Sequence, residues 1–424
     1  MAREPMNITE HEKGPMRLFA VRTGAKDVVT IEGSVFGGLY MLPRAKQMVP
    51  RMATNLFDAG TQNKTKEQLR SSLATKGASM YFSPGGDRTH FYASCLPEDT
   101  DFILKLIVEC LSEATFPPAE VTNQKKRTLA GLEELKSDTG TQASQALSRL
   151  IYEKEHVNYP DETSVDMEHA AQTTRKDMLK FQSMLGQGGL VLAIAGDIEP
   201  DKILKQAEKA FSKLPKGTAA ETVKRVNAKK PSVSEALVHI PDKATIDTYI
   251  GVHVPITYES EDYTALKVFV SMLGGNGLST GHLMRTIRER DGLTYGIAAG
   301  LRGLGGKADG AFGIHATFSP ATFNQAVAKV REEISIFLKT GMTEEALQIK
   351  KDELIGRYYV GLSTTRGLAG MLHMIGDEGK PLAYIDEYPS LIHAVTVADL
   401  KRVAMLIPFD KLSLAAAGTF DIKK

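Results

Sequence analysis

Arg288 and Tyr295 are the residues of this sequence whose types and spacing most readily suggest chemistry. The pattern predicts a basic helix over residues 281–290, and Gly292 follows where a left-handed helix stop is expected. An alternating strand then begins, with Tyr295 near its start. A guanidinium in the last helical turn and a phenol early in the strand can therefore point towards a common space. Two strong donors that converge on a carbonyl oxygen can stabilise an oxyanion.

The same segment also has a purely structural interpretation. Arg285, Arg288 and Arg290 could complement the negative end of the helix dipole. Tyr295 would then share one strand face with Ile297 and belong to the core. Spacing alone leaves both interpretations open, so the elements around this segment have to be considered.

Composition limits the classes of function. The chain has 424 residues, of which 42% are hydrophobic and 24% charged, and a formal net charge of +1. Its length predicts two or three domains, and its charge gives no reason to expect nucleic acid or an acidic membrane surface as a partner. Cys95 and Cys110 are the only cysteines, too few to crosslink a fold of this size. Without an apolar run of signal-peptide or membrane-span length, a cytoplasmic location is expected, or a periplasmic one if a signal peptide has been removed.

The order of the predicted elements occurs twice. Lys-Lys-x-x-Leu-x-Gly stands at 125–131 and at 350–356, an offset of 225. The helix-start pattern Thr-x-x-Asp begins at Thr174 and again at Thr396, an offset of 222, and Ala-Gly ends an apolar strand at 195–196 and 417–418 with the same offset. A near-constant offset through the same order of elements indicates an internal duplication.

The predicted fold class is therefore α+β, with two homologous domains that each pack an antiparallel-rich sheet against helices. The expected domains are residues 1–215 and 236–424, joined by a polar linker over 216–235. Alternation with internal glycines predicts an antiparallel strand pair within 28–42, and Thr65 is expected to cap a helix over 66–75.

The motif Arg288-Glu-x-x-Gly292-Leu-x-Tyr295, preceded by Leu-Gly-Gly, resembles the C-terminal-half signature of the M16 (pitrilysin-type) metallopeptidases, in particular of their M16B group. The resemblance covers nearly the whole chain and includes the duplication. It implies two domains of the LuxS-like metallohydrolase type. It also implies that Arg288 and Tyr295 bind the substrate backbone beside the scissile bond.

The resemblance also identifies a degenerate metal motif. The family binds zinc through an inverted His-x-x-Glu-His on the helix before a Gly-Thr, and through a Glu on a later helix. Against Gly60-Thr61, Arg51 and Asn55 stand at the two His positions, Thr54 at the position of the Glu base, and Glu133 at that of the third ligand. A cation repels zinc, Asn is a weak neutral ligand, and Thr is no base at pH 7. No zinc is therefore expected in this chain.

These expectations combine into one hypothesis. The chain would be the substrate-binding and transition-state-stabilising subunit of a heterodimeric zinc metallopeptidase, inactive by itself. A homologous M16 partner subunit would supply the zinc, and the substrate would be a peptide or unfolded polypeptide. Two alternatives stay open: a non-catalytic structural or assembly subunit, and a peptide-binding module without catalysis. The sequence predicts neither the substrate sequence nor the identity of the partner, and a homodimer is not excluded.

Overall fold

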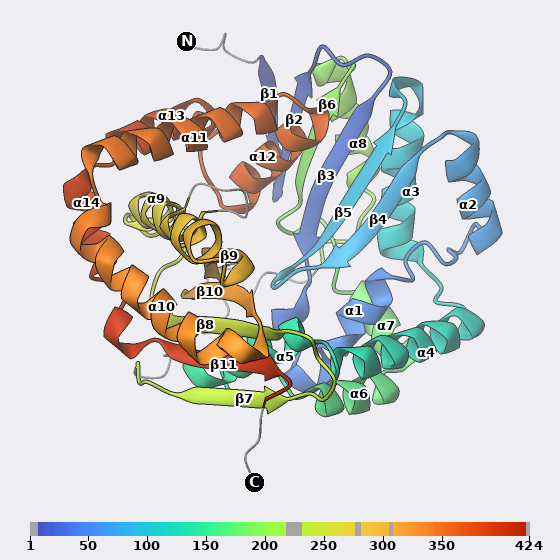
Figure 1. Cartoon of the computed structure of the whole chain (residues 1–424). Helices are drawn as coiled ribbons and strands as arrows, with labels where there is room; N and C mark the ends of the chain where they lie inside the picture. Colours follow the sequence, from blue (N-terminus) through green and yellow to red (C-terminus); the bar gives the residue numbers. More distant parts are fainter. Residues whose placement is uncertain (1–6, 218–230, 276–280, 305–307, 421–424) are drawn as a thin grey trace. The chain divides into compact units, whose positions relative to one another are not determined.

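The computed structural model describes residues 7–217, 231–275, 281–304 and 308–420, so most of the predicted linker 216–235 lies outside the described residues. The chain forms two compact units, whose elements are labelled in Figure 1. The first unit comprises Met1–Leu132, Ser164–Val223 and Arg357–Tyr388. The second comprises Glu133–Thr163, Lys224–Gly356 and Pro389–Lys424. Each unit thus combines most of one predicted domain with a helical segment from the other.

The first unit is built on a six-stranded sheet in the order β1-β2-β6-β3-β5-β4. Only β2 and β6 pair in parallel. The strands are β1 (Ile8–Lys13), β2 (Met16–Arg22), β3 (Val29–Phe36), β4 (Ser79–Pro84), β5 (Arg88–Cys95) and β6 (Val191–Gly196). Helices α3 (Thr100–Glu113) and α8 (Pro200–Phe211) share a core with Leu18 and Leu192 on one face of this sheet.

The other face of this sheet is covered by α12 (Thr365–Asp377), a helix from the second half of the sequence. Phe19 and Val191 alternate with the core residues of their strands and so point towards this helix. The contact is close, since a Cβ atom added at Gly376 would lie 2.5 Å from a Val191 methyl group.

The second unit repeats this plan with a five-stranded sheet in the order β7-β11-β8-β10-β9. Only β7 and β11 pair in parallel. The strands are β7 (Glu235–His239), β8 (Ile246–Val254), β9 (Thr294–Arg302), β10 (Gly310–Phe318) and β11 (Ser413–Gly418). One face packs on α5 (Thr139–Ile151), a helix from the first half. On the other face, Gly274 at the end of α9 (Tyr263–Gly274) lies against Ala299 of β9.

Further helices complete the units. Those of the first unit include α1 (Met48–Thr54), α2 (Lys66–Thr75) and α7 (Arg175–Gln182), and those of the second include α10 (Phe323–Ile336) and α14 (Val397–Ala404). Boundaries between the units fall within α4 (Pro118–Leu135), α6 (Thr163–Gln172), α11 (Glu344–Leu362) and α13 (Tyr384–Ala394). Among the described residues, no helix combines the length and apolar character that a bilayer span requires.

Local geometry supports the duplication. At the start of α7, the backbone N–H of Thr174 donates to Asp177 at 2.9 Å, and at the start of α14 that of Thr396 donates to Asp399 at 2.9 Å. In both cases the threonine side chain accepts from the aspartate N–H, which completes a capping box. The two halves therefore begin equivalent helices with the same hydrogen bonds.

One expected feature of the first sheet is wrong. Residues 28–42 do not form a strand pair, because only β3 is a strand and a 3-10 turn (Leu39–Met41) follows it. The strand ends at Gly37, whose φ of 128° suits glycine, and β3 pairs with the distant strands β5 and β6 instead. The helix predicted over 66–75 is confirmed as α2, with Thr65 and Gln68 in a capping box.

Candidate functional site

Arg288 lies in a π-helix, η4 (Met284–Arg290). The backbone N–H of Asp291 donates to the carbonyl of Thr286 at 3.0 Å, which is the five-residue spacing of this helix type. Ile287 is fully buried on the inner side of this helix. Gly292 has a φ of 63° and ends the helix in the expected left-handed conformation. Short π-helices are rare and often occur at functional sites.

A β-bulge at the start of β9 turns Tyr295 towards solvent. Ala316 lies opposite Ile297, but Phe318 lies opposite Thr294, so β9 contains one extra residue at this point. Tyr295 is 88% exposed whereas Ile297 is 2% exposed. The expectation that these two side chains share one strand face is therefore wrong, because the extra residue breaks the alternation. The interpretation of Tyr295 as a core residue is wrong for the same reason.

The side chain of Thr294 holds this bulge. Its hydroxyl accepts a hydrogen bond from the backbone N–H of Gly296 at 3.1 Å and donates one to the carbonyl of Thr317 at 2.8 Å. Thr294 is itself buried. The bulge, and with it the direction of Tyr295, therefore depends on a threonine hydroxyl directly before the tyrosine.

The structure brings Arg288 and Tyr295 together. The Cζ atom of Arg288 lies 5.1 Å from the centroid of the Tyr295 ring, within the range of a cation–π contact. The Nη1 atom of Arg288 also approaches the sulfur of Met284 at 3.9 Å. Within the described part of the chain, no carboxylate pairs with Arg288. A phenol and a guanidinium thus stand side by side at the surface as available donors.

Arg290 differs from Arg288 because its fork is already occupied. Its Nε and Nη2 atoms donate to the two carboxylate oxygens of Asp291 at 2.7 and 2.8 Å, and Nη2 also donates to Glu333 at 2.8 Å. The hydrogen bonds from Arg290 are the main cause that holds the pKa of the Asp291 carboxyl below its usual value. Arg290 therefore stabilises the segment, and Arg288 is the arginine that meets Tyr295.

The degenerate metal motif does not fit zinc. The hydroxyl of Thr54 is buried and donates to the carbonyl of Pro50 at 2.9 Å. The amide of Asn55 donates to the carbonyl of Arg51 at 2.9 Å, and the Arg51 side chain is exposed. The side chains of Thr54 and Asn55 thus donate hydrogen bonds to carbonyl groups of their own helix, while Arg51 brings a positive charge.

Glu133, at the position of the third zinc ligand, is an exposed residue of α4. Its carboxylate pairs with Lys136 at 2.8 Å, one turn further along the chain. This is an ordinary pair on a helix surface and needs no metal.

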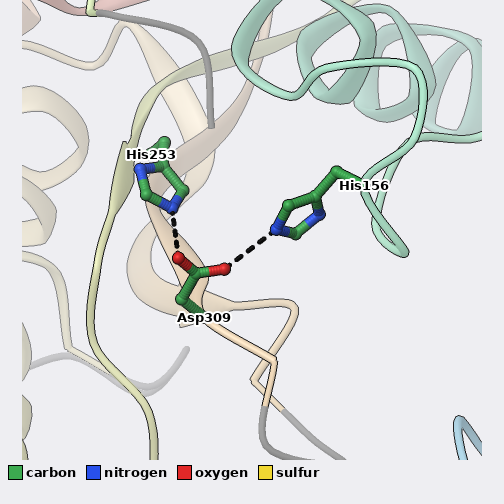
Figure 2. A group of neighbouring side chains, drawn as sticks. All are labelled: His156, His253 and Asp309. Carbon is green, nitrogen blue, oxygen red and sulfur yellow. Dashed lines mark hydrogen bonds and ion pairs between the residues drawn. The ribbon is translucent and has the colours of Figure 1, made fainter. Parts of the chain in front are cut away.

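A different group of potential ligands, which sequence reasoning missed, lies in the second unit. Figure 2 shows His156, from the segment after α5, and His253 of β8 on either side of Asp309, which directly precedes β10. The two Nε2 atoms lie 2.9 and 3.0 Å from the two carboxylate oxygens. Burial acts to raise the pKa of Asp309, but the hydrogen bonds from both imidazoles outweigh it and bring the pKa below its usual range.

The tautomer of His156 argues against a metal ion in this group. The backbone N–H of Asn158 donates to Nδ1 of His156 at 3.0 Å, so Nδ1 carries no proton. Neutral His156 therefore has its proton on Nε2, the atom that faces Asp309 and that a metal would need. Histidines that bind metals instead donate their second N–H to an acceptor. We interpret the group as a hydrogen-bonded clamp that joins three segments of the unit.

Comparisons with known proteins agree with this fold. The model described as Insulinase (Peptidase family M16) matches residues 51–162, and the model described as Peptidase M16 inactive domain matches residues 173–354. A crystal structure of a peptidase M16 inactive domain from Pseudomonas fluorescens superposes with a TM-score of 0.86 at 23% identity, over 99% of this chain and 100% of that chain. The likeness to that structure concerns the fold.

The relatives of this chain differ in the activity that their names state. An uncharacterised zinc protease of Streptomyces coelicolor is 22% identical over 87% of this chain and 80% of its own length. The non-peptidase homologue YmxG of Helicobacter pylori is 24% identical over 76% of this chain and 72% of its own. A probable mitochondrial-processing peptidase subunit beta of Arabidopsis thaliana is 20% identical over 85% of this chain and 68% of its own length.

The two matched models are both of the M16 family and follow one another along a single chain. The chain therefore belongs to the M16 peptidase family, in which it resembles the members described as inactive.

Proposed function

We propose that this chain is the substrate-binding and transition-state-stabilising subunit of a two-chain peptidase. Arg288 and Tyr295 would bind the carbonyl oxygen of the peptide bond that is cut. A homologous M16 subunit would provide the zinc, which supplies Lewis acidity and a bound water of lowered pKa. Alone, the chain would bind peptides and cleave none.

The contact between the half-buried Arg288 and the exposed Tyr295 is the observation on which this proposal rests. An 88% exposed tyrosine, turned out by a bulge and in contact with an arginine, contributes little to the core. Both groups are strong donors, and an oxyanion gains most from donors fixed before the reaction. β9 is also an edge strand of its sheet, so an extended peptide can approach Tyr295 without displacing a neighbouring strand.

The degenerate motif at Arg51, Thr54 and Asn55 supports the need for a second chain. These side chains give no zinc ligands, so the hydrolytic water has to be activated elsewhere. A subunit that retains donors but has no metal can act only beside a subunit that has one. Relatives named as subunits of a processing peptidase make such an arrangement reasonable for this chain.

A non-catalytic structural or peptide-binding subunit is the second candidate. It is favoured by the names of two relatives, a non-peptidase homologue in Helicobacter pylori and a probable inactive metalloprotease in Bacillus subtilis. In that case the partner's activity would not depend on donors from this chain.

Reconstitution separates the two candidates. Unstructured fluorogenic peptides are offered to the chain alone, to an M16 homologue from the same organism with an intact His-x-x-Glu-His, and to both together. We expect cleavage only by the mixture, removed by a chelator and restored by zinc. Full activity of the homologue alone, unchanged on adding the chain, would favour the non-catalytic candidate.

A further inference from the structure

Glu333 is a buried carboxylate to which the proposed mechanism gives no role. It lies on α10 and is 1% exposed. Its Oε2 atom accepts a hydrogen bond from Nε2 of His282 at 2.9 Å, and its Oε1 atom accepts one from Nη2 of Arg290 at 2.8 Å. Lys329 stands further off, 3.6 Å from Oε1, and pairs with Glu332 at 2.9 Å.

The two partners of Glu333 lie at opposite ends of one segment. His282 stands two residues before η4, and Arg290 is the last residue of that π-helix. Arg288 lies between them. One carboxylate on α10 therefore ties both ends of the helix that presents Arg288. Burial lowers the pKa of His282, so the imidazole is neutral at pH 7 and donates its Nε2 proton to Glu333.

Such ties matter because a single stretch of π-helix is not stable by itself. Its hydrogen-bond pattern is rare, and short π segments persist where their surroundings hold them. The buried side chains of Met284 and Ile287 help to set how far η4 turns about its own axis, and the hydrogen bonds to Glu333 act on the same rotation. That rotation decides whether the guanidinium of Arg288 lies over the Tyr295 ring, where Cζ is 5.1 Å from the centroid. A displacement of about 1 Å at a catalytic group can cost as much as a hundredfold in rate.

We propose that Glu333 is a positioning residue, which holds η4 so that Arg288 stays over Tyr295. The consequence for catalysis rests on the proposed function, whereas the consequence for geometry does not. A carboxylate accepts hydrogen bonds on both oxygens, while a carboxamide accepts on one side and presents an N–H on the other. Glu333→Gln therefore replaces the two charge-assisted hydrogen bonds to Arg290 and His282 with weaker neutral ones, with almost no change in volume.

A spectroscopic test is available because the chain contains no tryptophan. Tyr295→Trp introduces a single fluorophore at the position that Arg288 covers, and an indole is the ring that binds a cation best. In this background, Arg288→Ala gives the emission spectrum and acrylamide quenching of the uncovered indole. Glu333→Gln is compared with that reference. The matched control is Glu332→Gln, on the same helix, where the carboxylate is largely exposed and pairs with Lys329.

Glu333→Gln should move the emission and quenching of the introduced indole at least half of the way to the Arg288→Ala reference, while Glu332→Gln leaves both unchanged. Spectra of Glu333→Gln that match the parent would overturn the proposal. If circular dichroism shows that Glu333→Gln does not fold, Arg290→Gln is used instead. It weakens the contact between Arg290 and Glu333 by a change at an exposed side chain. It should cause the same shift, with Arg285→Gln as its control, and no shift would again overturn the proposal.

The activity of the mixture with the zinc-bearing homologue distinguishes this inference from the proposed function. In the Tyr295 background, Glu333→Gln should lower kcat by about tenfold with KM nearly unchanged, because misplaced donors weaken transition-state binding most. If Glu333→Gln shifts the indole emission but the mixture has no peptidase activity, the positioning role is supported and the proposed function is ruled out. If the activity depends on Arg288 but not on Glu333, the positioning role is ruled out and the proposed function stands.

Discussion

The three arginines of the 281–290 segment have different surroundings and therefore different roles. Arg290 is held by Asp291 and Glu333, and Arg288 lies over Tyr295. Arg285 is exposed and takes part in neither of these contacts, which makes it a matched control for charge. Charge alone thus cannot explain an effect that is specific to Arg288. The contact with Tyr295 distinguishes Arg288 from the other two arginines.

Asp309 should make the stability of the second unit depend on acid pH. Its folded pKa is below the ordinary value of 3.8, owing to hydrogen bonds from His156 and His253 that outweigh burial. A lowered folded pKa contributes stability above pH 3.8 and loses that contribution as the pH falls further. Urea unfolding between about pH 5 and about pH 3 should show a steeper loss for the wild type than for Asp309→Asn.

Asp410→Asn, at an exposed carboxylate of the same unit, is the control and should leave the slope unchanged. If Asp309→Asn also keeps the slope of the wild type, the clamp does not titrate in this range. Added zinc should not raise the stability of the wild type at pH 7, because Nε2 of His156 keeps its proton.

At the scale of elements, one bulge in β9 decides whether Tyr295 is a core residue or an exposed donor. Thr294→Val should destabilise the protein by about 1–3 kcal/mol, because the part-buried N–H of Gly296 and the carbonyl of Thr317 lose their shared hydroxyl. The loss is measured as the free energy of unfolding in urea. Thr294→Ser keeps the hydroxyl and should cost clearly less. An equal loss for both variants would point to packing of the threonine methyl group instead.

Features with a local cause were predictable from the sequence. The capping box at Thr65, the left-handed stop at Gly292 and the burial of Ile287 depend on residues within a few positions of one another. The bulge and the π-helix were not predictable, because one extra residue in a strand depends on the register with its neighbour. The role of Glu333 was not predictable either, because its two partners lie 43 and 51 residues away along the chain.

The hydrogen-bonded clamp of His156, His253 and Asp309 was also not predictable from the sequence. Its members are separated by 153 and 56 residues from Asp309, so no spacing motif joins them. His253 itself is nearly buried. Asp309 comes close to His253 only because β8 and β10 are neighbouring strands, in the register that pairs His253 with Ala311.

At the scale of the whole molecule, each sheet is covered by a helix from the other half of the duplication. α5 packs against Tyr249, Ala415 and Ala417 of the second sheet, and α12 packs on the first. The sequence repeats predict two halves, but they cannot indicate which sheet a given helix will cover. Apolar faces on both helices and both sheets fit either arrangement.

Separate expression of residues 1–215 and 236–424 should therefore leave an apolar sheet face uncovered in each fragment. We expect both fragments to bind the dye ANS and to exchange amide hydrogens quickly when alone, because exposed apolar surface and loose packing accompany an uncovered sheet. Co-expression should restore protection in β6 and β11. Two well-protected fragments that bind no dye would show that the exchanged helices are dispensable.

The central claim is that Arg288 and Tyr295 act on a peptide bond opposite the zinc of another chain. Its most direct test is kcat/KM for peptide cleavage by the mixed subunits, with wild type, Arg288→Ala, Tyr295→Phe and the control Arg285→Ala. Loss of one oxyanion donor should lower the rate about a hundredfold, and Arg285→Ala should leave it unchanged. Equal kcat/KM for Arg288→Ala, Tyr295→Phe and the wild type would contradict the claim.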